Sequence, residues 1–196
     1  MFWWRFAWVF DQRIIIKVNN KKEKLEDFKT AISSTVRSIS NSKKVEISFG
    51  NQISNSENST IKLPELSRTN NKFNIEEIRA IADSKSLNLR FSNNKTYKKY
   101  EPKGNISKKL YKISEKIRCE KIGTSYFRGV KNNIEKFYLN RLSGLDLKSS
   151  EDKIIESFEN YLRVKFLDFK NENKIDKKLK SYKKDLNEQF KNKIAE

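Results

Sequence analysis

The chain has 196 residues, enough for one domain with a hydrophobic core, and its residues are 35% charged and 36% hydrophobic. Glycine occurs 5 times and proline 2 times, too rarely for the many turns of a compact β-sandwich. We therefore predict a mainly α fold, an elongated multi-helix domain. Histidine is absent and Cys119 is the single cysteine, which excludes a Ser-His-Asp or Cys-His catalytic unit, the usual cysteine and histidine zinc site and a disulfide within one chain.

The lone cysteine also indicates a compartment and a role. Secreted domains of this size commonly carry disulfides, so a chain that cannot form one internally is expected in a reducing compartment, the cytoplasm. Cys119 falls within a helical pattern, where a thiol behaves as a small hydrophobe more often than as a nucleophile.

The formal net charge of +18 has two interpretations. Such a charge is typical of proteins that bind a polyanion, either nucleic acid or an anionic membrane. It also follows from AT-rich codon usage, because 33 of the 43 basic residues are lysine and asparagine, isoleucine and phenylalanine are abundant. The lysines are scattered along most of the chain, whereas nucleic-acid binders more often cluster arginine with aromatic residues, so the compositional interpretation is favoured.

Residues 1–22 differ from the rest and are interpreted as a Trp-rich leader, unstructured or arising from a misplaced start, followed by a single domain over 23–196. All three tryptophans lie in the leader. Its apolar run is too short for a membrane span and lacks the charge order of a signal peptide. An interfacial membrane anchor is the alternative, because tryptophan favours the membrane boundary.

The first elements of the domain follow from hydrophobic periodicity. From Lys24, apolar residues recur every three or four positions until Asn41, which predicts an amphipathic helix. The alternation in 45–49 predicts a strand, and 61–63 predicts a second strand that returns beside it as a small β-hairpin near residues 45–63. The segment 67–72 is expected to be a loop.

Further helical segments are expected along the rest of the chain. Asn74 with Glu77 resembles a capped start, and Ile75 to Leu89 follows it as a helix that Asn93 and Asn94 end. Beyond Pro102 and Gly104 a long stripe runs to Phe137, and the glycines at 123 and 129 predict two helices or a kink near 123–129. A capping box at 149–152 opens a helix whose apolar stripe comprises Ile154, Ile155, Phe158, Leu162 and Phe166. The last helix is expected over 175–194.

The motif search predicts no catalytic residue and no metal-binding residue. No phosphate-binding loop of the P-loop type occurs, and the adjacent carboxylates lie at predicted helix starts, where negative charge is favoured. Asp83-Ser84-Lys85-Ser86 has the wrong spacing for a DxSxS metal site. Charged residues on two predicted helices are the candidate partner-binding residues, with surface salt bridges as the alternative interpretation. They are Arg79, Asp83, Arg90, Glu115, Arg118 and Glu120.

The stretch from Lys62 to Ile134 resembles a known family. Its first part contains Leu63-Pro64-Glu65, Ala82-Asp83-Ser84, Leu87, Leu89, Arg90, Pro102 and Gly104. Its most specific part contains Glu115, Arg118, Glu120, Ile122-Gly123, Gly129-Val130 and Asn133-Ile134. In this order and spacing the residues are similar to the N-terminal helical region of the cobaltochelatase subunit family CobT. The similarity covers about residues 25–196, weakly at the ends and well between 62 and 134.

The resemblance implies a non-catalytic subunit of an ATP-dependent cobaltochelatase, a ligase complex that forms nitrogen–metal bonds in aerobic cobalamin biosynthesis. The expected partners are a CobS-type AAA+ ATPase, for which the chain would be a scaffold, and a CobN-type large subunit that inserts cobalt into hydrogenobyrinic acid a,c-diamide. We expect a hetero-oligomer, with no specific nucleic acid and no membrane partner. No cofactor is expected in this chain, while ATP, magnesium and cobalt are implied for the complex.

The sequence also departs from the family. The C-terminal von Willebrand A-type domain is missing, so the chain is interpreted as truncated or as the product of a split gene. Histidines that the family has after the position of Arg90 are replaced, with Ser92 and Tyr97 nearby. Two alternatives therefore stay open: a basic helical nucleic-acid-binding protein, and one part of an AAA+/von Willebrand A pair that remodels another target.

Overall fold

A computed structural model describes residues 23–50, 60–66, 68–69, 72–144 and 149–169. It confirms a mainly α fold. The elements are a helix over 23–40, β1 (Glu46–Phe49), β2 (Thr60–Leu63), β3 (Arg68–Thr69), β4 (Lys72–Phe73), α2 (Ile75–Phe91), α3 (Asn94–Lys99), α4 (Asn105–Tyr126), α5 (Arg128–Gly144) and α6 (Ser150–Leu167). The predicted leader, 1–22, and the predicted last helix, 175–194, lie outside the described residues.

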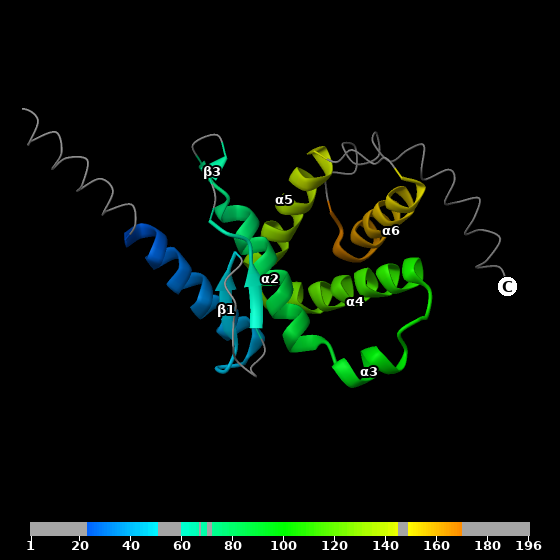
Figure 1. Cartoon of the computed structure of the whole chain (residues 1–196), viewed down its shortest axis with the longest axis horizontal. Coiled ribbons are helices and arrows are strands. Elements are labelled where there is room, and N and C mark those ends of the chain that lie inside the picture. The colour runs from blue at the N-terminus through cyan, green and yellow to red at the C-terminus, as the bar shows by residue number, and fades with distance from the viewer. Residues whose placement is uncertain (1–22, 51–59, 67, 70–71, 145–148, 170–196) are drawn as a thin grey trace, which may run out of the picture.

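Helix α2 is the central element of the fold (Figure 1). The helix over 23–40 and the β1–β2 sheet lie on one side of it, and α4 and α5 lie on the other, with α6 alongside α4. Short α3 forms part of the connection between α2 and α4. Among the described residues, no helix combines the length and the apolar content that a bilayer crossing requires.

Two hydrophobic clusters flank α2. The first joins the helix over 23–40, the sheet and the first half of α2, and it contains Ile32, Val36, Val45, Ile61, Leu63, Ile78 and Ala82. The second joins α2 to the later helices and contains Ile39, Leu87, Ile117, Val130, Ile134, Tyr138, Leu142, Leu167 and Phe169. The predicted stripe of the first helix is thus confirmed, since Ile32, Val36 and Ile39 are all buried.

The predicted β-hairpin near residues 45–63 is wrong, although both strands exist. β1 and β2 pair in parallel, with Ile47 opposite Ile61 and Phe49 opposite Leu63. Gly50 ends β1 in the left-handed region at φ +66°, which glycine adopts without a steric penalty, and its N–H donates to the Leu63 carbonyl at 2.9 Å. An antiparallel pair does occur within the predicted loop 67–72 and just beyond it, between β3 and β4.

The helix boundaries follow local polar residues. Asn74 stands at the start of α2, but its side chain donates to the Glu65 carbonyl at 3.2 Å. The predicted side-chain cap of α2 by Asn74 is therefore wrong. Helix α2 ends at Phe91 with Ser92 as its C-cap, just before the predicted break at Asn93. Asn93 caps α3, because its side-chain oxygen accepts from the N–H groups of Lys95 and Thr96. The predicted interruption near 123–129 is confirmed as a break at Phe127 between α4 and α5.

Helix α6 begins as predicted but is rotated from its predicted orientation. The Ser149 hydroxyl accepts from the Asp152 N–H at 3.0 Å, which confirms the cap. The predicted stripe included Phe166, which is 51% exposed. The buried face is instead largely polar, and it consists of Glu156, Ser157, Glu159, Asn160, Arg163 and Leu167.

Candidate functional site

Glu115 and Arg118 form one unit on α4 that holds the end of α2. Arg118 Nε donates to Glu115 Oε2 at 2.7 Å, and Nη2 donates to Glu115 Oε1 at 2.9 Å and to the Phe91 carbonyl at 2.8 Å. The hydrogen bond from Arg118 lowers the pKa of Glu115. A cation is favoured at a helix C-terminus, so this pair fixes α4 against the last turn of α2.

Arg79 and Arg90 make separate contacts on α2. The Arg90 guanidinium donates to the Ile39 carbonyl at 3.0 Å, which ties α2 to the last turn of the helix over 23–40. It also lies over the rings of Phe91 and Phe127 at 5.4 and 5.6 Å from their centroids. Arg79 lies over the Phe28 ring at 5.8 Å, and it forms no ion pair with Asp83, four residues further along the helix.

Asp83 joins α2 to α5. It is only 5% exposed, and its Oδ2 accepts from Asn133 Nδ2 at 2.8 Å. Burial raises the pKa of Asp83, while the Asn133 hydrogen bond and the charge of Arg79 oppose that change. Asp83 therefore acts as an internal link between two helices.

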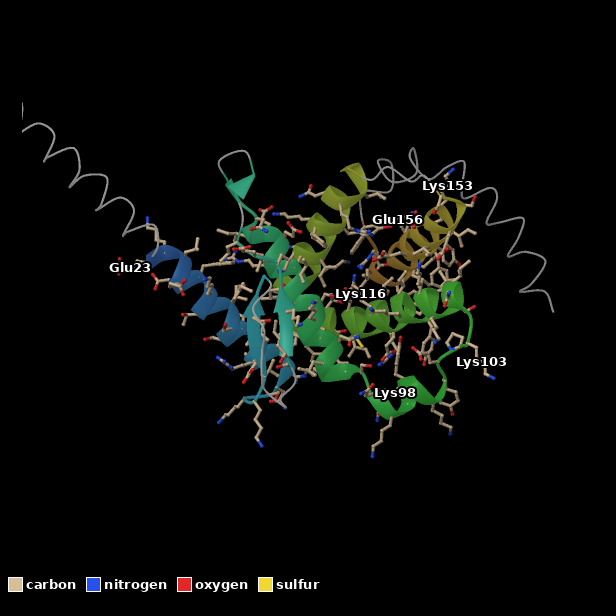
Figure 2. All side chains as sticks on the ribbon, in the orientation of Figure 1. Glu23, Lys98, Lys103, Lys116, Lys153 and Glu156 are labelled. Atoms are coloured by element: carbon tan, nitrogen blue, oxygen red, sulfur yellow. The ribbon has the colours of Figure 1, made fainter. Side chains whose placement is uncertain are left out.

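Glu120 belongs to a buried ionic network, which we define as Glu120, Arg141, Glu156, Glu159 and Arg163. Arg163 Nη1 donates to Glu120 Oε2 at 2.7 Å, and Nη2 donates to Glu159 Oε1 at 2.7 Å. Arg141 donates to Glu156 Oε1 at 2.7 Å and to Glu159 Oε2 at 3.0 Å. The network thus joins α4, α5 and α6, and Figure 2 shows Glu156 on α6.

The network also reaches α2 and the second hydrophobic cluster. The Ser84 hydroxyl donates to the remaining oxygen of Glu120, which has no exposed surface. The guanidinium groups of Arg163 and Arg141 lie 4.7 and 5.1 Å from the centroid of the Tyr138 ring. Each buried charge therefore meets opposite charge or a polar partner, which is the condition under which burial of charge is tolerated.

The two carboxylates on α6 respond differently to this environment. Burial raises the pKa of Glu156, and the charge of Arg141 offsets this only in part. Burial acts in the same direction on Glu159, but the positive charges of Arg163, Lys116 and Arg141 outweigh it and lower its pKa. Glu159 is consequently the carboxylate whose ionised form the fold stabilises.

The comparison with known proteins agrees with this framework. The family model for the cobalamin biosynthesis protein CobT matches residues 22–157. The chain belongs to the CobT family. No solved structure matches the chain. Membership associates the chain with cobalamin biosynthesis.

The residues that carry the resemblance to CobT have structural roles here. The contacts described above connect helices through the Glu115–Arg118 pair, through Glu120 and through Asn133. Val130 and Ile134 lie in the second hydrophobic cluster. Gly123 is buried where α4 meets Leu87 of α2. The CobT-like segment therefore specifies how α2, α4 and α5 pack together.

The structure separates the candidate partner-binding residues by burial. Asp83 and Glu120 are buried and have internal partners. Glu115 is half-buried and paired with Arg118, while Arg79, Arg90 and Arg118 are exposed. A direct partner contact by the exposed residues stays a prediction. The described residues include no group of three or more cysteine, histidine or acidic side chains arranged to hold a metal ion.

Most of the buried network was not predicted from the sequence. Of its members only Glu120 was a candidate; Arg141, Glu156, Glu159 and Arg163 were not. The spacing of Glu159 and Arg163, four residues apart, was an available signal, but such pairs usually occur on solvated helix faces. The sequence pattern alone does not show which ion pairs another helix covers.

Cys119 is predicted to be inert in the folded chain. It is fully buried in α4, and burial followed by the charge of Glu115 raises its pKa to about 12. Because the thiolate is the reactive form, iodoacetamide is expected to label Cys119 slowly near neutral pH and rapidly once denaturant unfolds the chain. Mass spectrometry over time measures both rates, and rapid labelling of the native chain would contradict the assignment.

Proposed function

We propose that this chain is a non-catalytic scaffold subunit of an ATP-dependent cobaltochelatase complex. In this proposal it binds a CobS-type AAA+ ATPase, which supplies the ATP and magnesium sites, and a CobN-type large subunit, which inserts cobalt into hydrogenobyrinic acid a,c-diamide. The complex would act in the cytoplasm. Membership of the CobT family over residues 22–157 is the observation that carries the proposal.

The packing of the described helices supports a scaffold role. The charged residues that the sequence singled out are occupied mainly in joining one helix to another, as with Glu120 and Arg163 at 2.7 Å. Several ring side chains remain exposed on different elements and could take part in protein contacts, among them Tyr100, Tyr126 and Tyr161 at 62, 71 and 54%. Exposed tyrosines suit protein contacts because they combine apolar area with a polar group.

Co-purification tests the proposal. The tagged full-length chain is mixed with the CobS-type ATPase in ATP with magnesium, in ADP and without nucleotide, and the mixture is analysed by size-exclusion chromatography. A joint peak in at least one nucleotide state is the expected result. Separate elution in all three states would contradict the proposed function.

A matched pair of variants tests the exposed part of the candidate surface. Arg79→Ala removes an exposed guanidinium that contacts only the Phe28 ring within the described chain, while Arg128→Ala removes an exposed guanidinium from α5. If the Arg79 surface binds the ATPase, Arg79→Ala weakens co-purification and Arg128→Ala does not. If both variants co-purify with the ATPase to the same extent, Arg79 is not part of the interface. The experiment with the wild-type chain then still tests the proposed function.

A further inference from the structure

A groove of about 640 Å³ lies along α2 and α4, bordered by β2 and reaching α6. Its floor includes Ser84, Glu120 and Arg163, so it opens beside the buried ionic network. Lys85 lines it from α2, and Lys112 and Lys116 line it from α4. Figure 2 shows Lys116 where α4 passes beside α2.

These three lysines, which we call the groove lysines, gather positive charge that no carboxylate of the described part of the chain fully neutralises. Lys85 Nζ donates to the Lys62 carbonyl at 2.6 Å, and Lys112 pairs with no carboxylate of the described residues. Lys116 Nζ lies 3.7 Å from Glu159 Oε1, an oxygen that already accepts from Arg163. Burial, with the positive charges of Lys112 and Lys116, lowers the pKa of Lys85.

The acidic residues of the groove do not offset this charge. Glu120 accepts from Arg163, and Glu115 accepts two hydrogen bonds from Arg118. Lysines elsewhere on the described surface do form carboxylate pairs, as Lys29 does with Glu26, Lys109 with Glu151 and Lys121 with Asp168. Like charges held together disfavour the folded chain unless an anion lies among them.

The lining of the groove indicates which anion fits. Beside the lysines the lining includes apolar side chains, among them Ile61, Ile81 and Phe137. Single-stranded nucleic acid binds through a series of free aromatic faces beside basic groups, but the groove is lined by two aromatic residues, Phe137 and Tyr97, and Tyr97 is stacked on Tyr111 with ring centroids 4.8 Å apart. A lining that combines apolar side chains with positive charges suits a peptide in which acidic side chains alternate with aliphatic ones.

We propose that this groove binds an acidic segment of a protein partner, whose carboxylates pair with Lys85, Lys112 and Lys116. The proposal deepens the scaffold function and rests on it only for the identity of the partner. The contact supplies the counter-charge that the described residues do not provide. Because Lys85 is partly desolvated at the groove, a carboxylate pairs with it there more strongly than at an open surface.

Fluorescence anisotropy with the full-length chain tests this surface without any ATPase. The probe is a labelled peptide of alternating glutamate and alanine, and the comparison peptide has glutamine in place of glutamate. Substitution of the groove lysines, Lys85→Gln, Lys112→Gln and Lys116→Gln, is expected to weaken binding of the acidic peptide by at least about tenfold. The glutamine peptide is expected to bind neither chain.

A second triple variant controls for net charge. Lys44→Gln, Lys98→Gln and Lys103→Gln remove the same charge from exposed lysines that do not line the groove, and Figure 2 shows Lys98 and Lys103 projecting away from the body of the chain. Its affinity is expected to stay within about twofold of wild type. Equal losses in the two triple variants would overturn the proposal, because binding would then follow total charge.

Two further measurements do not depend on the folding of a variant. Carbodiimide cross-linking of the acidic peptide to the wild-type chain should map by mass spectrometry to the groove lysines and to Lys62, which also lines the groove. Links spread over lysines that do not line the groove would contradict the site. A single-stranded oligonucleotide of equal charge is expected to compete weakly. If it displaces the peptide at lower concentration than unlabelled peptide does, the groove is a nucleic-acid site and the peptide assignment is wrong.

Discussion

Replacing Arg163 by methionine is expected to lower the free energy of unfolding by about 3–5 kcal/mol, because the change leaves buried carboxylates without their main partner. Arg163 is 2% exposed, and it lies 2.7 Å from both Glu120 and Glu159. Ser84 still donates to Glu120 and Arg141 to Glu159, but a hydroxyl and a shared guanidinium do not replace the lost charge. Urea denaturation followed by circular dichroism measures the effect.

Lys109→Met is the matched control for Arg163→Met. Lys109 and Glu151 are also 2.7 Å apart, but their side chains are 56 and 40% exposed. Water screens such a pair, so its loss should leave the free energy of unfolding nearly unchanged. If the two variants lose similar stability, the ionic network does not contribute through its burial, and the role assigned to Arg163 is wrong.

The Arg163→Met deficit is also expected to depend on pH. In the wild-type chain the pKa of Glu159 is lowered, so its ionised form adds stability above the unfolded pKa, and this stability is lost as the pH falls through the folded pKa. Without Arg163, burial dominates and Glu159 is expected to favour its protonated form. The difference between variant and wild type should therefore be smaller at about pH 5 than at about pH 7. A deficit that grows on acidification would contradict this assignment.

Local signals in the sequence predicted the helices well. The stripe of Ile32, Val36 and Ile39 is periodic and buried, and Ser149 caps α6 in the predicted position. Each signal lies within a few residues of the structure that it specifies. The short helix α3 was missed because Asn93 and Asn94 were interpreted only as a helix break, whereas Asn93 caps a second helix that begins at Asn94.

The pairing of the strands required information that periodicity does not contain. Two short strands joined by a connection such as 50–59 usually form a hairpin, since parallel strands normally need a longer crossover. Here Ile61 and Leu63 lie in the first hydrophobic cluster with Ile47 and Phe49 packed against it. Alternation places these side chains on one face in either strand direction, so the sequence pattern could not decide between parallel and antiparallel pairing.

The buried network shows the same limit for charged residues. The polar face of α6 is covered by α4, and Glu120 meets Arg163 across 43 positions of the chain. A prediction that buries the apolar stripe of α6 leaves its polar face in solvent. The reason is that an uncompensated buried charge costs much more free energy than an exposed apolar side chain. Only the helix arrangement shows that compensation exists.

Gly123→Ala is expected to destabilise the fold by about 1–3 kcal/mol, although alanine is the better helix former. A Cβ at Gly123 would lie 2.5 Å from Cδ1 and 2.8 Å from Cγ of Leu87. Leu87 is fully buried in the second hydrophobic cluster, so it cannot move aside without displacing other core side chains. Thermal and urea denaturation measure the loss.

Gly129→Ala separates this packing effect from helix propensity. Gly129 lies in the first turn of α5, and a Cβ there would meet no atom within 4 Å. This variant should be neutral or more stable by up to about 1 kcal/mol, the intrinsic preference for alanine. Equal losses at the two glycines would mean that the close approach of α4 and α2 is not what requires glycine at 123.

A double-mutant cycle with Leu87→Ala identifies the atom group responsible. Leu87→Ala alone is expected to cost about 2–5 kcal/mol through the cavity that it leaves. Because it also removes the carbons that an added Cβ would meet, Gly123→Ala should cost less in the Leu87→Ala chain than in the wild type. Additive losses would place the strain elsewhere. A smaller loss from Gly123→Ala in the Leu87→Ala chain would show that the glycine of the CobT-like segment allows α2 and α4 to pack closely. Both the ionic network and the lysine groove depend on that distance between the two helices.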